Sequence, residues 1–179
     1  MSAPVLVAYA SRDGHARRIA ERVARTLPAA ELHDLGDAPA AADRLAATPL
    51  AVLIAAVRYG KHLPPAERFL ATYKALASPP PLALASVNLT ARKPEKNTPA
   101  TNPYLAKLTA RHGLAPDDAA VFAGKLDYPR YRWFDRQMIR LIMAMTGGPT
   151  EPTTVVDYTD WAAVDAFAAQ LRRHTADAA

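Results

Sequence analysis

The sequence of 179 residues contains no cysteine, which excludes disulfide bonds, thiolate catalysis and cysteine-ligated metal or iron–sulfur centres. It also lacks a long hydrophobic segment. The longest uninterrupted apolar run, residues 50–57, is far shorter than the about 20 residues that a membrane-spanning helix needs. No basic segment precedes the short apolar run near the N-terminus, so we expect no signal peptide. Half of the residues are apolar and the net charge is +5, which is typical of a globular protein. We therefore expect a folded protein in a reducing, cytoplasmic compartment.

Strand-like and helix-like segments alternate along the chain. The strand-like segments are apolar, of strand length and bounded by turn residues, and they cover residues 5–9, 31–35, 50–57, 82–89 and 119–126. The helix-like segments between and after them cover residues 15–27, 37–47, 66–77, 103–112 and 161–174. Apolar strands that alternate with helices predict a parallel sheet covered by helices on both faces.

Five such units predict an α/β fold of the flavodoxin-like, doubly wound type, with a five-stranded parallel sheet in the order 2-1-3-4-5. A dinucleotide-binding fold is the rival, but the G-x-G-x-x-G fingerprint is absent after the first strand, where the loop holds only Gly14. We expect a single domain over residues 1–179, with an inserted helical segment at residues 127–152, near strand 5.

Three loops of this sheet are expected to converge at one edge, where a ligand would bind. The first loop joins a strand to a helix N-terminus and suits a phosphate, with Arg12 as a counter-charge. The second offers an aromatic ring beside a glycine, and the third offers polar groups for the edge of a planar ring. Each feature alone is typical of an ordinary turn, but together they favour an FMN site. The predicted cofactor-binding residues are Ser11, Arg12, Asp13, Gly14, His15, Tyr59, Gly60, Ser86, Val87, Asn88 and Leu89.

The insert at residues 127–152 combines a wide apolar surface with clustered cations. A helix is expected from residue 131 to residue 146, ended by two glycines and a proline. It packs its apolar side on the domain, lies on an anionic membrane surface, or lines the entrance of a flat apolar substrate. A dimer interface is a further alternative.

Six short stretches carry a resemblance to a known family. SRDG, RYG, SVNL, ARKPEK, YPRYRW and YTDW closely resemble the flavodoxin-like, menaquinone-dependent protoporphyrinogen IX dehydrogenases (protoporphyrinogen oxidases) of haem biosynthesis, and the similarity runs from residue 5 to about residue 167. ARKPEK and YPRYRWFD are the most specific, because ordinary flavodoxins lack them. The first loop departs from the usual flavodoxin loop: Ala16 stands at a hydroxyl position, and Asp13, which replaces another hydroxyl, is expected to cap the following helix.

The resemblance implies FMN-dependent oxidation of protoporphyrinogen IX to protoporphyrin IX, a six-electron reaction in three rounds, with menaquinone or ubiquinone as the acceptor. It also implies a peripheral position at the inner face of the cell membrane. Basic and aromatic side chains would then meet the propionates and the macrocycle of the substrate. The candidate substrate-binding residues are Arg92, Lys93, Lys96, Arg130, Arg132, Trp133 and Arg136. His62 is the candidate proton relay, and the histidine spacing predicts no metal site.

Three other functions fit parts of the sequence. A flavodoxin-like electron carrier shares the fold, but such carriers are typically acidic and this chain is basic. An NAD(P)H:quinone reductase on the same fold stays open. A nucleic-acid-binding module would stack bases on Tyr131, Trp133 and Phe134, beside the arginines of the insert. The convergence of the three loops would then be accidental. We therefore expect no nucleic acid partner.

Overall fold

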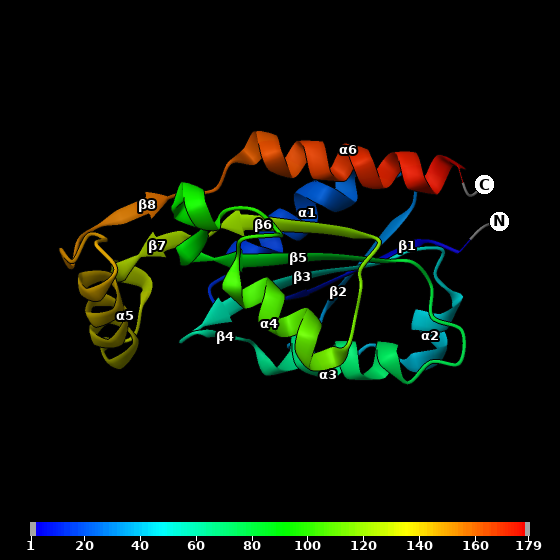
Figure 1. The fold of residues 1–179 in the computed structure, drawn as a ribbon, viewed down its shortest axis with the longest axis horizontal. Helices are drawn as coiled ribbons and strands as arrows, with labels where there is room; N and C mark the ends of the chain where they lie inside the picture. The colour runs from blue at the N-terminus through cyan, green and yellow to red at the C-terminus, as the bar shows by residue number, and fades with distance from the viewer. Residues whose placement is uncertain (1–2, 178–179) are drawn as a thin grey trace.

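The computed structural model describes residues 3–177, in which a twisted parallel sheet lies between helices (Figure 1). The strands of this sheet run parallel in the order β2-β1-β3-β5-β6, which confirms the predicted 2-1-3-4-5 order. They are β1 (Val5–Ala10), β2 (Ala30–Asp34), β3 (Ala51–Arg58), β5 (Leu82–Asn88) and β6 (Asp118–Ala123). Because all five strands point the same way, the loops that follow them meet at one edge of the sheet.

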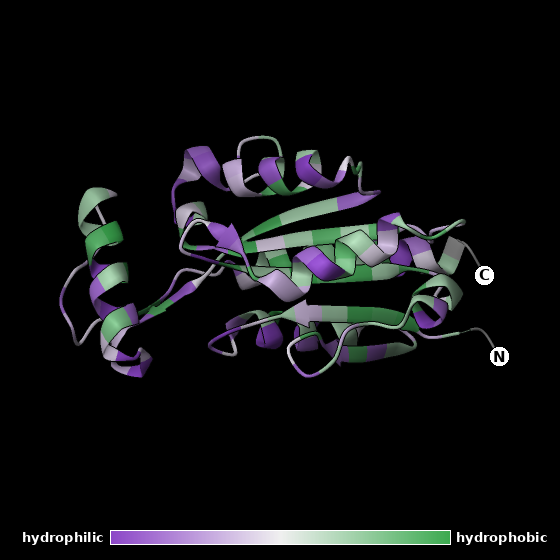
Figure 2. Cartoon of the chain, turned by 90° about the horizontal axis from the view of Figure 1, so that it is seen from below, coloured by the Kyte–Doolittle hydropathy of each residue, from purple (hydrophilic) through white to green (hydrophobic). Residues whose placement is uncertain are grey.

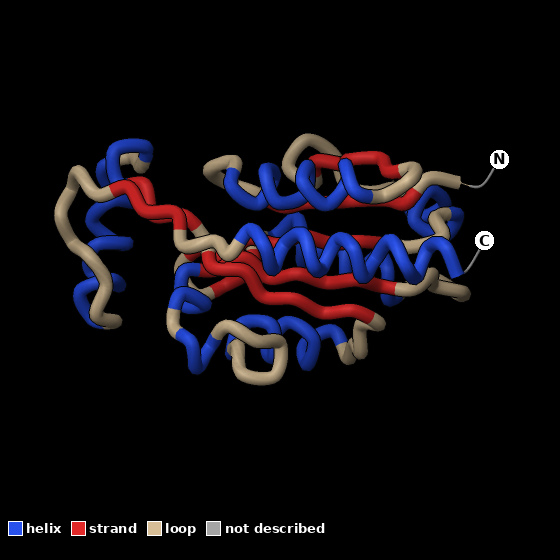
Figure 3. Tube along the Cα trace, turned by 90° about the horizontal axis from the view of Figure 1, so that it is seen from above, coloured by secondary structure: helices blue, strands red, loops and turns tan. Residues whose placement is uncertain are grey.

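Helices cover both faces of the sheet because the strand side chains alternate between two apolar layers. In β1, Val5 and Val7 face the layer beneath α1 (His15–Thr26) and α6 (Trp161–Asp177). Leu6 and Ala8 face the opposite layer. That layer is covered by α2 (Ala42–Ala47), α3 (Pro64–Lys74) and α4 (Pro103–His112). Figure 3 shows α1 and α6 side by side across the first of these faces.

Three elements differ from the expectation. The helix predicted from residue 37 begins only at Ala42, because Pro39 lies in the segment before it. A short strand, β4 (Lys61–His62), pairs antiparallel with the end of β3 and was not predicted. The predicted fifth strand is broken at Gly124, where the chain leaves the sheet and continues as β7 (Lys125–Asp127). β7 pairs antiparallel with β8 (Val155–Asp157), so β8 does not join the central sheet.

The two-stranded ribbon β7–β8 carries residues 128–154 beyond the end of the sheet (Figure 3). This segment contains the 3-10 turn η3 (Tyr128–Arg130) and the helix α5 (Trp133–Met145), which confirms the predicted helix to within two residues. It has a small core of its own, formed by Leu126, Tyr128, Tyr131, Ile139 and Met143. Figure 2 shows that α5 stands apart from the sheet and that much of it is hydrophobic. No helix within residues 3–177 combines the length and the apolar character needed to cross a membrane.

Candidate functional site

A cavity lies between the carboxyl edge of the sheet and α5. Including its open mouth it encloses about 1130 Å³, and the loops after β1, β3 and β5 line it together with α5 and the start of α4. The convergence of these three loops was the central prediction about the site, and the structure confirms it.

The loop after β1 presents the free end of α1 to the cavity. Gly14 has a φ of 86° at the helix N-cap, and its backbone N–H donates to Oγ of Ser11 over 3.1 Å. The first turn of α1 contains no acidic residue, and no side chain caps it. The expectation that Asp13 caps this helix is therefore wrong. Uncapped N–H groups and the positive end of the helix dipole suit an anion here.

Asp13 is instead paired with Arg58, the last residue of β3. Arg58 Nη2 lies 2.8 Å from Asp13 Oδ2, and the Arg58 side chain is only 11% exposed. The same guanidinium lies 5.8 Å from the ring centre of Tyr59 and 5.2 Å from that of Tyr131. Arg58 thus neutralises a carboxylate beside the anion-binding loop and holds two aromatic rings. Sequence analysis missed it, although its place at the carboxyl end of a central strand was a usable signal.

The loop after β3 is a two-residue hairpin that presents an aromatic ring. Arg58 pairs with Lys61 across it, and Tyr59 (φ 51°) and Gly60 (φ 76°) form the turn. A tight hairpin of this kind requires a positive φ at both central residues, which glycine adopts freely and tyrosine does not. Tyr59 is 41% exposed and lines the cavity, as predicted. Its hydroxyl donates to Asp135 of α5.

The loop after β5 is supported by a buried polar network. His62 contacts Oγ of Ser86 over 2.7 Å, and Ser86 Oγ accepts from Asn88 Nδ2 over 3.0 Å. Asn88 and Asn102 bond to each other, and Asn102 caps α4 by accepting from Tyr104 and Leu105. Burial lowers the pKa of His62 to about 4, so it is neutral near pH 7. His62 does not line the cavity. Its contact with Ser86 places it in the network that holds the loop after β5.

The YTDW stretch connects the first loop to the end of the β7–β8 ribbon that adjoins the central sheet. His15 Nε2 contacts Oγ1 of Thr159 over 2.6 Å, and that hydroxyl donates to the carbonyl of Ala123. Because the Thr159 hydroxyl donates its only hydrogen to Ala123, it must accept a hydrogen bond from His15. Nε2 of His15 therefore carries a hydrogen. Burial lowers the pKa of His15, which favours this neutral form. Trp161 packs edge-on against the His15 ring, with ring centres 5.8 Å apart.

Three arginines donate to backbone carbonyls of the insert that carries α5. Arg92, from the 3-10 turn η1 (Leu89–Arg92), donates to the carbonyl and the hydroxyl of Thr146, each over 3.1 Å. Arg136 donates to the carbonyl of Tyr128 over 3.1 Å, and Arg140 to that of Thr150 over 2.7 Å. Arg92 therefore connects the end of α5 to the loop after β5, whereas Arg136 and Arg140 make contacts within the insert itself.

One side of α5 closes the cavity and the other faces outward. Ile139, Ile142 and Met143 line the cavity. The opposite side leaves four large apolar side chains exposed: Trp133 by 71%, Phe134 by 63%, Leu141 by 54% and Met145 by 72%.

The predicted site residues divide between the cavity wall and its surroundings. Nine of the predicted cofactor-binding residues line the cavity: Ser11, Arg12, Asp13, His15, Tyr59, Gly60, Val87, Asn88 and Leu89. Gly14 and Ser86 do not line it. Of the candidate substrate-binding residues, Arg92 and Arg130 line it, whereas Lys93, Lys96, Arg132, Trp133 and Arg136 do not.

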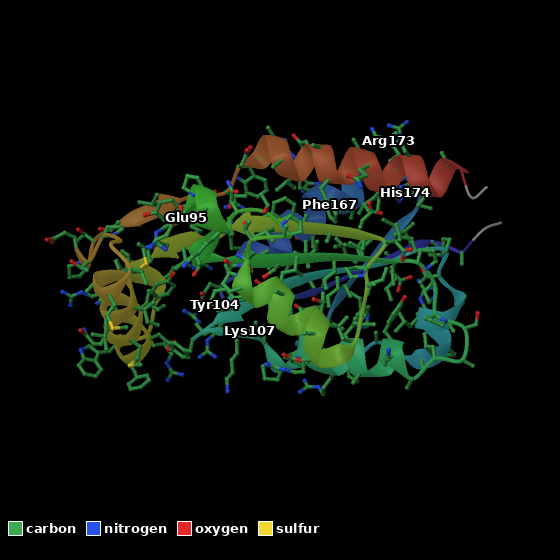
Figure 4. All side chains as sticks on the ribbon, viewed as in Figure 1. Glu95, Tyr104, Lys107, Phe167, Arg173 and His174 are labelled. Atoms are coloured by element: carbon green, nitrogen blue, oxygen red, sulfur yellow. The ribbon has the colours of Figure 1, made fainter. Side chains whose placement is uncertain are left out.

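Sequence analysis also missed Tyr104, which lines the cavity from the first turn of α4. Figure 4 places Tyr104 at the end of α4 nearest the insert. No motif marks it, because only the fold brings α4 to this edge. Among residues 3–177, no three His, Asp or Glu side chains form a group suited to a metal ion.

Comparisons with known proteins bear directly on this arrangement. A family model described as a flavodoxin domain matches residues 6–153. The chain is 41% identical over 177 residues to protoporphyrinogen IX dehydrogenase [quinone] of Escherichia coli (strain K12), covering 95% of both chains. The chain belongs to the flavodoxin-like protoporphyrinogen IX dehydrogenase family. A relative with the same name from Leishmania major is 39% identical over 171 residues, covering 93% of this chain and 73% of the relative.

Solved structures agree on the fold. Rubredoxin oxygen:oxidoreductase from Desulfovibrio gigas superposes with a TM-score of 0.53 at 11% identity, over 99% of this chain and 37% of that one. The structure also explains the stretches that distinguish this dehydrogenase family. ARKPEK supplies Arg92, which clamps the end of α5, and YPRYRW supplies Tyr128 and Tyr131 to the core of the insert. YTDW supplies Thr159, which holds His15.

Proposed function

We propose that this chain is an FMN-dependent oxidoreductase of haem biosynthesis, which oxidises protoporphyrinogen IX to protoporphyrin IX and passes the electrons to a quinone. The observation that carries the proposal is the 41% identity, over 95% of both chains, to the E. coli enzyme named for this substrate and this acceptor. Each round removes two hydrogens from the macrocycle, so three quinones are reduced to quinols for each porphyrin formed.

The cavity fits FMN on three observations. The uncapped N-terminus of α1 and Ser11 can receive a phosphate, and the carboxylate of Asp13 is neutralised by Arg58. A Cβ at Gly14 would meet no atom within 4 Å, so there is open space at this point. Tyr59 can lie against the flavin ring, and Val87 to Leu89 can meet its polar edge. Bound FMN would supply the redox step, and the protein positions and shields it.

The other wall of the cavity suits an apolar macrocycle with carboxylate arms. Ile139, Ile142 and Met143 of α5 face the cavity and would exclude water from the reacting ring. Arg130 is exposed and lines the cavity, and the side chain of Arg12 is 51% exposed. These two guanidinium groups are our candidates for the propionates, since Arg pairs bidentately with carboxylates. Arg92 and Arg136 donate to carbonyls and have fewer free donors.

A steady-state assay tests this function. Purified protein supplied with FMN and a quinone should convert protoporphyrinogen IX to fluorescent protoporphyrin IX under anaerobic conditions. Porphyrin formation that does not depend on added quinone would contradict the proposal. Flavin that is reduced by NAD(P)H and not by the porphyrinogen would favour the quinone reductase alternative. Flavin that accepts electrons from neither would favour the electron carrier.

We further propose a single flavodoxin-like domain over residues 1–179, in which residues 127–152 form an insert that docks on an anionic membrane. The support is the outer side of α5, where Phe134, Met138, Leu141 and Met145 follow a helical spacing. Arg130 and Arg132 are exposed beside it. Each basic residue near an anionic membrane surface contributes about 1 kcal/mol to binding.

Vesicle co-sedimentation tests the docking side of α5. The double variant Phe134→Ser/Leu141→Ser should bind vesicles of mixed zwitterionic and anionic lipid at least about tenfold more weakly than wild type, because about 1.4 kcal/mol of lost apolar burial suffices. Its FMN affinity should be unchanged, since neither side chain lines the cavity. The matched control is Leu32→Ser, which removes a leucine that is 42% exposed on β2. Equal loss in the control, or undiminished binding in the double variant, would contradict the membrane proposal.

A further inference from the structure

The turn that presents Tyr59 to the cavity is conformationally costly. Tyr59 is the one non-glycine residue among those described with a positive φ, at 51°. For a residue with a side chain, this left-handed region is less favourable than the right-handed one. Strained conformations of this kind persist where surrounding contacts hold them in place. The contacts of Tyr59 therefore indicate which interactions stabilise this unfavourable turn.

Two groups hold the ring of Tyr59. The guanidinium of Arg58 lies 5.8 Å from its centre, and the carboxylate of Asp135 accepts the hydrogen bond of its hydroxyl. Asp135 is the third residue of α5 and is buried, with 8% of its surface exposed. The hydroxyl of Tyr59 is thus held from the insert, whereas its ring is also contacted from the strand that carries it.

Asp135 also reaches the first loop. Its Oδ2 lies 3.5 Å from Nη2 of Arg12, so one carboxylate joins the loop after β1, the hairpin after β3 and the start of α5. The hydrogen bond from Tyr59 lowers the pKa of Asp135, and the charges of Arg58, Arg12 and Arg132 lower it too. Asp135 is therefore ionised near neutral pH. It does not line the cavity, whereas Tyr59 and Arg12 both do.

We infer that Asp135 is a positioning residue, which fixes the ring of Tyr59 and the guanidinium of Arg12 in the wall of the flavin site and so makes that site depend on the insert. The inference rests on the proposed FMN-dependent function. It explains why a carboxylate lies within an otherwise apolar and basic helix: on the buried side of α5, Asp135 precedes Ile139 and Met143 by one and two turns.

Four variants test the inference through flavin binding. Asp135→Asn keeps the shape and removes the charge, Asp135→Ala removes both, and Tyr59→Phe removes only the hydroxyl. The fourth is the double variant Tyr59→Phe/Asp135→Asn. The matched control is Glu151→Gln, because Glu151 is an exposed carboxylate of the same insert. Each protein is titrated with FMN, and the residual flavin fluorescence at saturation is recorded, since a ring held against the flavin quenches it. Thermal unfolding of each apoprotein shows whether it is folded.

Loss of a hydrogen bond to a charged group should weaken FMN binding about tenfold in Asp135→Asn and in Tyr59→Phe. The double variant should be little weaker than Asp135→Asn alone, because Tyr59→Phe removes a contact that Asp135→Asn already disrupts. Residual fluorescence should rise in the Asp135 variants, and Glu151→Gln should match wild type. Additive losses, or wild-type affinity and fluorescence in folded Asp135→Asn, would overturn the inference. Absence of FMN binding by wild type would instead overturn the proposed function.

Discussion

The pairing of Asp13 with Arg58 makes a quantitative prediction about cofactor binding. In the variant Arg58→Gln, the carboxylate of Asp13 loses the guanidinium that lies 2.8 Å away, and an uncompensated negative charge remains in the loop expected to hold the FMN phosphate. Asp13 is 37% exposed, so water screens part of this charge. A charge-assisted hydrogen bond of about 1.5–3 kcal/mol converts to a loss of FMN affinity of about ten- to one-hundredfold.

Titration with riboflavin distinguishes the effect of the substitution on phosphate binding from its effect on binding of the flavin ring. It lacks the phosphate, so Arg58→Gln should weaken its binding only by the lost cation–π contact with Tyr59, about 0.5–1 kcal/mol. The double variant Asp13→Asn/Arg58→Gln should recover most of the FMN affinity, because no unpaired carboxylate remains. Arg111→Gln is the matched control. Arg111 Nη1 lies 2.6 Å from a carboxylate oxygen of Glu67, and neither residue lines the cavity. The reasoning is refuted if the double variant binds FMN as weakly as Arg58→Gln, or if riboflavin and FMN lose equal affinity.

Two further predictions concern stability. Burial lowers the pKa of His62 from 6.5 to about 4, so the unfolded chain takes up this proton first as the pH falls. The free energy of unfolding should therefore decrease between pH 6.5 and pH 4, by about 3 kcal/mol from this group, and urea unfolding of His62→Gln should lack that part of the decrease. An identical pH dependence in both proteins would show that His62 is not buried as a neutral group. Gly14→Ala should cost about 1–2 kcal/mol of unfolding free energy through strain alone, because φ is 86° and a Cβ would meet no atom within 4 Å. Unchanged stability in a chemical denaturation series would mean that the loop adopts another conformation.

The sheet and the place of the site were predictable because they depend on local patterns. Continuous apolar runs such as residues 50–57 mark strands buried on both faces, and alternation with helices makes those strands parallel. The carboxyl ends of parallel strands share an edge, so the loops at Ser11, Tyr59 and Asn88 had to meet. No knowledge of side-chain contacts was needed for this conclusion.

The roles of the charged residues were not predictable in the same way. An arginine can bind a carboxylate, a phosphate or a backbone carbonyl, and only the fold shows which of these lies within reach. Arg136 was a candidate for substrate binding, but it donates to a carbonyl of the insert, as Arg140 also does. Asp13 read as a helix cap, but the hairpin brings Arg58 to it from β3. The break at Gly124 is also a tertiary effect, because β7 finds its partner in β8, about 30 residues later.

The most direct test of the account is an anaerobic titration of the FMN-loaded protein with protoporphyrinogen IX, followed through the visible absorbance of the flavin. The absorbance of oxidised flavin should disappear as porphyrin forms, and it should return when a quinone is added. Flavin that is bound in the cavity but stays oxidised in the presence of excess porphyrinogen would contradict the central claim.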